Sequence, residues 1–238
     1  MAPPANPKPE DGHRKTVRYF SFGPVGEALK DLEIDLDTCS CCQTAIGATS
    51  DGFIAAYRDH QPGDIRDIAV VRFADGVWTK PKTLHPDGWK INDYPADEPS
   101  IATQEKNATV VWITRAGEIP KLQVALSRDN GSHFAAPVQI DDGKPLGRAS
   151  IVVLDDSNYL VAWIEKTGDG GKAQIRMKWI SLDGQTSQSV VAAEASTSRL
   201  AGFPKLAVSK DQILVAWRDG NIRAVTLNVN QFRGKDTK

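Results

Sequence analysis

A short apolar segment that ends in an aromatic residue recurs four times along the chain. The four segments are 53–57 (FIAAY), 108–112 (ATVVW), 159–163 (YLVAW) and 213–217 (ILVAW). Their closing aromatic residues lie 55, 51 and 54 positions apart, so the sequence has a nearly constant period. A period of this length predicts an architecture in which one supersecondary unit is used several times.

Each repeat also contains further short segments rich in Val, Ile and aromatic residues, separated by Gly, Asn, Asp and Pro. This punctuation favours β-strands over helices. In the first repeat we expect strands over 43–49, 53–57, 66–73 and 78–84. Four antiparallel strands per repeat predict an all-β fold, a β-propeller with about four blades in this chain. A β-sandwich is the alternative, but it gives no reason for every second strand to share one pattern.

The two ends of the predicted propeller do not form complete blades. Residues 16–22 and 27–35 are typical of two outer strands, whereas 206–228 supplies three inner strands. In one arrangement the N-terminal strands complete the last blade and close a small four-bladed ring. In the other, the chain is part of a larger propeller, such as a six-bladed ring.

Composition excludes several classes of protein. The chain has 29 Lys and Arg against 30 Asp and Glu, a formal charge of −1, so it has no net positive field for binding nucleic acid. No apolar run approaches the roughly 20 residues of a membrane-spanning helix, so we expect no transmembrane segment. The first residues are rich in Pro and lack the apolar core of a signal peptide. We expect a disordered Pro-rich tail over 1–15, a single propeller domain over 16–230 and a polar tail over 231–238.

The turn expected between the third and fourth strands of the second repeat contains a short motif. Ser127, Asp129, Gly131 and Phe134 follow the pattern Ser-x-Asp-x-Gly-x-x-aromatic. A short Asp side chain accepts bonds from backbone N–H groups, Gly adopts positive φ, and the aromatic ring closes the apolar side of the turn. The pattern resembles the Asp box of the BNR repeats in the sialidase (neuraminidase) superfamily. We therefore expect these four residues to have a structural role.

More of the chain, over most of residues 39–219, resembles uncharacterised bacterial exported proteins described as sialidase-like. The matching segments include 39–44 (CSCCQT), 87–89 (DGW), 143–148 (GKPLGR) and 202–204 (GFP). The resemblance implies a periplasmic or extracellular location. It also favours either the second arrangement, in which the chain is part of a larger propeller, or a shortened ring, because such relatives carry further blades upstream. They also have a Cys before the Pro that opens the second repeat, whereas this chain has Tyr94 there and lacks that fourth thiol.

Loops on one face of the predicted propeller hold the residues best suited to a ligand. Chain direction alternates within a blade, so the loops after the second and fourth strands emerge together, and binding residues are common in such loops. We expect an anionic or glycan small ligand, or a protein partner, to be bound by Arg58, Asp59, Trp89, Arg148 and Arg218. Guanidinium groups suit carboxylate or phosphate, which favours Arg148 and Arg218. Arg58 and Asp59 fit an ion pair between blades better, and Trp89 fits loop packing as well as a carbohydrate platform.

A sialidase reaction makes stricter demands on the sequence. It needs arginines for the substrate carboxylate, a carboxyl group as acid and base, and a Tyr nucleophile activated by a Glu, which is unusual among glycosidases. Tyr94 is the one Tyr that lies outside the predicted strands, and Asp97 and Glu98 are close to it in sequence. These three are the catalytic candidates. Because a propeller scaffold alone does not establish chemistry, we favour a sialidase-like binding module over an exo-acting glycosidase.

The sequence has a second informative feature, three closely spaced cysteines, Cys39, Cys41 and Cys42. In an exported protein, a disulfide from Cys39 to Cys42 or to Cys41 is the plainer interpretation, with one thiol left over. Thiolates also favour Cu(I) or Zn, which gives a metal-binding alternative. The sequence has no Gly-rich phosphate loop and no nucleotide fingerprint, so it predicts no other cofactor.

Overall fold

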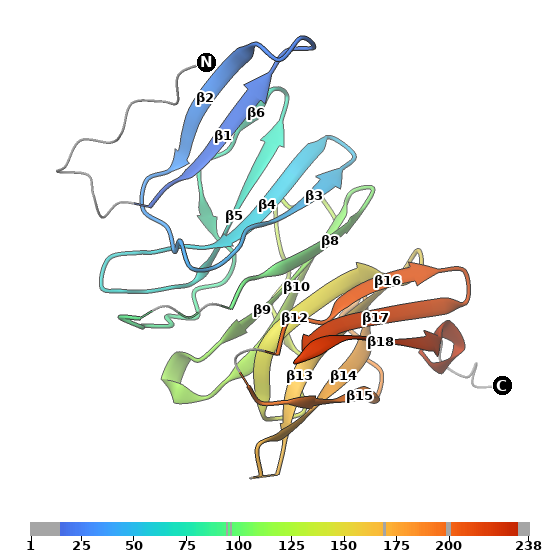
Figure 1. Ribbon diagram of the computed structural model, residues 1–238. Helices are drawn as coiled ribbons and strands as arrows, with labels where there is room; N and C mark the ends of the chain where they lie inside the picture. The colour runs from blue at the N-terminus through green and yellow to red at the C-terminus, as the bar shows by residue number, and fades with distance from the viewer. Residues whose placement is uncertain (1–14, 94, 96, 169, 199–200, 233–238) are drawn as a thin grey trace.

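The computed structural model describes residues 15–93, 95, 97–168, 170–198 and 201–232. Over these residues the chain forms five antiparallel β-sheets that follow one another along the sequence (Figure 1). The helical elements in this part of the chain are two 3-10 helices, η2 (Ala116–Glu118) and η3 (Val229–Gln231). Neither has the length or the apolar character needed to cross a membrane.

The four sequence repeats form four of the sheets, each with its strands paired in sequence order. The first sheet contains β3 (Ala45–Thr49), β4 (Gly52–Arg58), β5 (Ile68–Ala74) and β6 (Val77–Trp78), and β7 (Lys82–Thr83) also pairs with β5. The second contains β8 (Ser100–Gln104), β9 (Asn107–Thr114), β10 (Lys121–Ser127) and β11 (Val138–Gln139). The third contains β12 (Pro145–Val153), β13 (Asn158–Thr167), β14 (Lys172–Ser181) and β15 (Val190–Ser196). The fourth contains β16 (Lys205–Ser209), β17 (Gln212–Asp219) and β18 (Asn221–Asn228).

The first strands of the four sheets lie next to one another. Strand β3 contacts β8, β8 contacts β12, and β12 contacts β16. The sheets therefore fan out from a shared inner edge, as consecutive blades of a β-propeller do. The prediction of an all-β propeller made of four-stranded antiparallel units is confirmed.

The recurring aromatic residue packs each sheet against the one before it. Trp112 lies in the apolar core between the first and second sheets, Trp163 between the second and third, and Trp217 between the third and fourth. Trp112 and Trp163 are fully buried. Burial of one such side chain contributes about 1.5–3 kcal/mol of hydrophobic stabilisation, so the repeated aromatic residue helps to hold each interface together.

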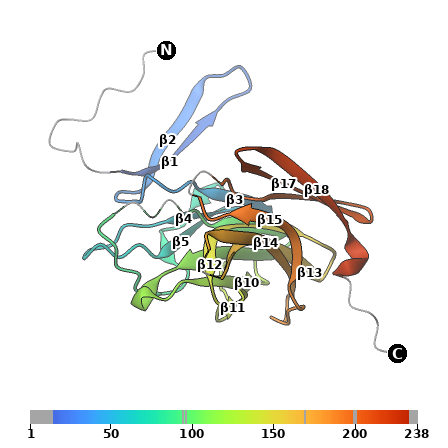
Figure 2. The same cartoon turned by 60° about the horizontal axis from the view of Figure 1, so that its bottom comes forward.

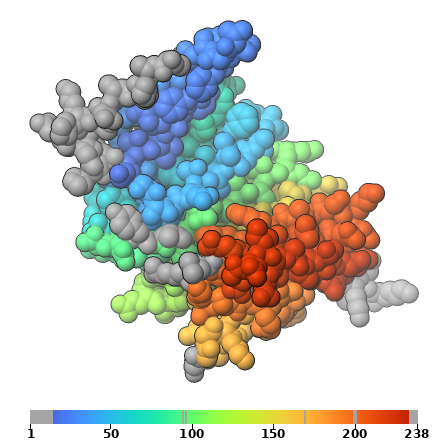
Figure 3. Space-filling model, in the orientation of Figure 1, coloured from blue at the N-terminus to red at the C-terminus, as the bar shows by residue number. Residues whose placement is uncertain are grey.

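The N-terminal hairpin forms a sheet of its own. Its strands β1 (Val17–Phe22) and β2 (Ala28–Asp35) pair with each other and stand beside the sheet of β3–β7. The ring of Tyr19 lies 5.6 Å from that of Phe73, and the hydroxyl of Tyr57 donates to Asp35 at 2.7 Å. The hairpin projects from the blades in Figure 2, and Figure 3 shows it at the opposite end of the molecule from β16–β18. Completion of the last blade by the N-terminal strands, one of our two predicted arrangements, is therefore wrong.

The fourth strands are shorter than the sequence predicted in two of the blades. The segment 78–84 forms only the short strands β6 and β7, and 134–140 forms only β11. Pro81 and Pro137 interrupt these segments, and proline has no N–H to donate to a sheet. The predicted tails, 1–15 and 231–238, fall almost wholly outside the described residues.

Candidate functional site

A cavity of about 570 Å³ opens where the connections that follow the first and third blades, the loop after β9, and residues of β12 and β17 meet. Its charged and aromatic lining residues are Trp89, Asp93, Asp97, Arg115, Arg148, Phe203 and Arg218. These residues are far apart in sequence, and the propeller geometry brings them to one place. We call this space the arginine cavity.

A bulge in the inner strand β12 presents Arg148 to the arginine cavity. The pairing of β12 with β13 shifts register between Gly147 and Ser150, and both Gly147 and Arg148 have positive φ, 87° and 57°. A non-glycine residue in this conformation costs roughly 1 kcal/mol or more. Bulges commonly re-aim a side chain next to a functional site, which is what β12 does here.

Asp97 lies among the arginines of the cavity. One of its carboxylate oxygens is 3.6 Å from the guanidinium of Arg115, and the residue is 7% exposed. Burial raises the pKa of Asp97 above its usual value, although Arg115, Arg58 and Arg148 act in the opposite direction. This carboxyl group can therefore orient the arginines, and it holds a proton to a higher pH than an exposed aspartate does.

Arg58, one of the predicted ligand residues, is buried beneath the arginine cavity instead of lining it. It is 1% exposed and donates to the carbonyl oxygens of Arg66, Asp97 and Ile113 at distances from 2.6 to 3.2 Å. Its guanidinium carbon lies 4.6 Å from the centre of the Trp89 ring. The side chain therefore ties together three segments of two blades.

Of the other predicted site residues, some lie in the cavity wall and some outside it. Trp89 reaches the cavity wall but is 4% exposed, so its ring packs on Arg58 and offers no open platform. Asp59 accepts from the side chain of Gln61 at 3.1 Å, outside the cavity lining. Glu98 is also outside the lining, and burial raises its pKa. Tyr94 lies outside the described residues.

The turn after β10 has the hydrogen bonds expected of a self-capped hairpin. The hydroxyl of Ser127 donates to Asp129 at 2.8 Å and accepts from the backbone N–H of Gly131 at 2.9 Å. Asp129 accepts from the backbone N–H of His133, and Gly131 has φ of 78°. Phe134 packs against the core between the first two sheets. These contacts are structural and lie apart from the lining of the arginine cavity.

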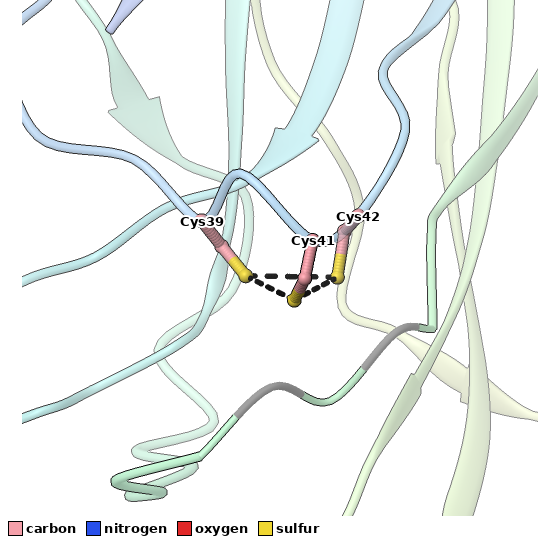
Figure 4. Close-up of side chains that lie close together, drawn as sticks. All are labelled: Cys39, Cys41 and Cys42. Atoms are coloured by element: carbon pink, nitrogen blue, oxygen red, sulfur yellow. Dashed lines mark hydrogen bonds between the residues drawn. The ribbon is translucent and has the colours of Figure 1, made fainter. Parts of the chain in front are cut away.

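The three cysteine sulfurs meet in the loop between β2 and β3 (Figure 4). The sulfur of Cys39 is 3.0 Å from that of Cys41 and 3.7 Å from that of Cys42, and the last two are 3.7 Å apart. None of the three is joined to another in a disulfide. The hydrogen bond with Cys42 lowers the pKa of Cys39 to about 5, and the same bond together with burial raises the pKa of Cys42.

No protein-family model and no curated protein sequence matches this chain. Solved structures of β-propellers do match it. The Hadza microbial sialidase Hz136 aligns with a TM-score of 0.52 and 13% identity, over 85% of this chain and 49% of the sialidase. A Trypanosoma rangeli sialidase aligns with a TM-score of 0.51 and 13% identity, over 90% of this chain and 39% of that one. The six-bladed fucose-recognising lectin of Aleuria aurantia aligns with a TM-score of 0.51 and 11% identity, over 88% of this chain and 70% of the lectin.

These likenesses establish the fold. The chain has the blade architecture of a β-propeller, and it spans about half the length of the Hadza sialidase and less of the trypanosomal one. Identities this low say nothing direct about chemistry, because one fold serves many functions.

Three of the charged and aromatic lining residues, Asp93, Arg115 and Phe203, were not among our predicted site residues. All three lie in loops that the sequence had already grouped on one face. Arg115 follows the second strand of its repeat, and Asp93 and Phe203 each precede the first strand of the next repeat. The sequence therefore indicated which loops would lie together. The structure was needed to show which of their residues line the cavity.

Proposed function

We propose that this protein is a β-propeller binding module that holds an acidic glycan in the arginine cavity. The observation that carries the proposal is that Arg115, Arg148 and Arg218, from three different blades, line one cavity. Guanidinium groups bind carboxylates in a bidentate manner, and three of them around one space favour a ligand with a carboxylate.

The size and the remaining lining also support a sugar. A volume of about 570 Å³ is within the usual range of small-molecule sites and suits a sugar of one or two units. Phe203 supplies an apolar surface beside the arginines, and Asp93 and Asp97 supply acceptors for hydroxyl groups. The proposed location is periplasmic or extracellular, which rests on the sequence resemblance to exported sialidase-like proteins.

The test is binding of sialic acid and of glucuronic acid, each compared with its methyl ester, by isothermal titration calorimetry. We expect binding of at least one free acid and a loss of about tenfold or more on esterification, since the charged contact is removed. Arg148→Ala and Arg218→Ala should each weaken binding by a similar factor. Arg128→Ala is the matched control, because Arg128 is exposed on the turn after β10.

Two results would contradict the proposal. One is equal affinity for acid and ester, which would show that the carboxylate is not recognised. The other is unchanged affinity in both Arg148→Ala and Arg218→Ala, which would place the ligand elsewhere.

Hydrolysis by the same cavity is the second candidate function, because the buried carboxyl group of Asp97 lies in the cavity lining, and burial shifts its pKa in the direction that a general acid needs. Release of the chromophore from a chromogenic sialoside, abolished by Asp97→Asn and by Tyr94→Phe, would support it. No turnover on a broad glycoside panel, together with binding of the free acid, would leave binding as the function.

A further inference from the structure

We propose that Cys39, Cys41 and Cys42 form a three-sulfur binding site for Cu(I). The site is separate from the arginine cavity and does not depend on the proposed glycan. Thiolates are soft ligands, and Cu(I) is the soft monovalent ion that such ligands select.

The spacing of the sulfur atoms fits a single metal ion. With separations of 3.0, 3.7 and 3.7 Å, a point equidistant from the three sulfurs lies about 2.0 Å from each, close to the ~2.3 Å of a thiolate–metal bond. An ion placed about 1.1 Å out of the plane of the three sulfurs lies ~2.3 Å from each of them. Figure 4 shows the three side chains converging on this point from one short loop.

The backbone holds this loop in place. The N–H of Cys39 donates to the carbonyl oxygen of Arg58 at 3.1 Å, and Thr38 forms a β-bridge with Asp59. Cys39 and Cys42 are buried, at 5% and 8% exposure, whereas Cys41 is partly exposed. Cys39 and Cys42 shield the ion from water, and the ion can enter the site from the partly exposed side at Cys41.

Fixed positive charges compensate the charge of the filled site. Three thiolates and one Cu(I) carry two net negative charges. The guanidinium of Arg58 interacts electrostatically with Cys39 and Cys42, and Arg66 interacts with Cys39, which supplies two positive charges. Buried charges are tolerated when they are paired in this way. On binding, the thiols release their protons to solvent and copper does not change its oxidation state.

The ligand count favours Cu(I) over Zn(II). Structural zinc sites in proteins are almost always tetrahedral, with four protein ligands. Among the described residues no His, Asp or Glu joins the three sulfurs in this group. Three sulfurs alone satisfy a three-coordinate Cu(I) ion.

The test is an anaerobic titration of the reduced full chain with Cu(I) delivered from a chromophoric chelator. We expect uptake of one equivalent per chain, with thiolate-to-copper absorption in the ultraviolet, and no displacement by excess Zn(II). Cys39→Ser, Cys41→Ser and Cys42→Ser should each weaken the affinity by at least about tenfold, since each removes one of three ligands. Ser40→Ala, the exposed residue within the same loop, is the control and should leave uptake unchanged.

Folding of each variant is checked by its circular dichroism and thermal unfolding. Cys41→Ser is the decisive variant because Cys41 is partly exposed, so its replacement leaves the core intact. The proposal is overturned by sub-stoichiometric uptake, by unchanged affinity in the folded Cys41→Ser protein, or by tighter binding of Zn(II). A disulfide between two of the three cysteines that glutathione does not reduce would also overturn it. Glycan binding is measured on the same variants and should not change, so failure of one proposal is distinguishable from failure of the other.

Discussion

The guanidinium of Arg58 stacks on the indole of Trp89, with its central carbon 4.6 Å from the ring centre. Trp89 lines the arginine cavity on one side, and Arg58 lines a small pocket with Cys39 and Cys42 on the other. One buried cation therefore separates the cavity from the thiol cluster and supports both. The first prediction concerns its removal.

Arg58→Met should lower the free energy of unfolding by about 2–4 kcal/mol. The substitution keeps much of the apolar stem but leaves the carbonyl oxygens of Asp97 and Ile113 without their buried donor. Urea unfolding measures the loss. Arg128→Met is the control, because Arg128 is exposed in an ion pair with Asp183, and its cost should stay below about 1 kcal/mol. Equal costs in the two variants would contradict a supporting role for Arg58.

Gly147→Ala tests the bulge that forms the arginine cavity. A Cβ at this position would lie 2.6 Å from a carboxylate oxygen of Asp97 and 3.1 Å from Ile113, at a φ of 87°. We expect a loss of about 2–3 kcal/mol in the free energy of unfolding and weaker binding of the acidic glycan, because Asp97 must move.

Gly143→Ala is the matched control for that variant. Gly143 also has positive φ, 111°, but nothing lies within 4 Å of the added Cβ. The free energy of unfolding of Gly143→Ala should therefore fall by only about 1 kcal/mol, the cost of the backbone conformation, and glycan binding should be normal. Identical behaviour of the two glycine variants would show that Gly147 matters for its φ alone.

Asp97→Asn tests the electrostatics of the cavity. The pKa of an aspartate in the unfolded chain is about 3.9, and burial raises the pKa of Asp97 in the folded chain. At any pH between these two pKa values, the folded state therefore binds more protons than the unfolded state. The stabilisation from this group is present below that window and is lost as the pH rises through it. The free energy of unfolding of the wild type, minus that of Asp97→Asn, should therefore fall as the pH rises from about 4. A constant or rising difference, measured by urea unfolding across this range, would contradict the raised pKa.

The repeated features of the fold were predictable from sequence, whereas the fate of individual site residues was not. Arg58 and Arg218 each follow the repeat aromatic directly, so they are equivalent in the sequence pattern. In the structure Arg218 lines the cavity, but Arg58 is covered by Trp89 and by the backbone around Asp97. That covering comes from the long connection between the first and second blades. A repeat pattern carries no information about such a non-repeated segment.

The turn after β10 shows the opposite case, because its local motif predicted that Asp129 accepts a backbone N–H there, as it does from His133. Ser127 is 2% exposed, and its hydroxyl accepts from the N–H of Gly131. Ser127→Ala leaves that buried N–H without its acceptor, so the free energy of unfolding should fall by about 1–2 kcal/mol in urea denaturation. Ser209→Ala, at an exposed strand end, is the control and should change it by less than about 0.5 kcal/mol. If Ser127→Ala costs no more than this control, the turn is held by its backbone and by Asp129 alone, and the serine of the motif has no structural role.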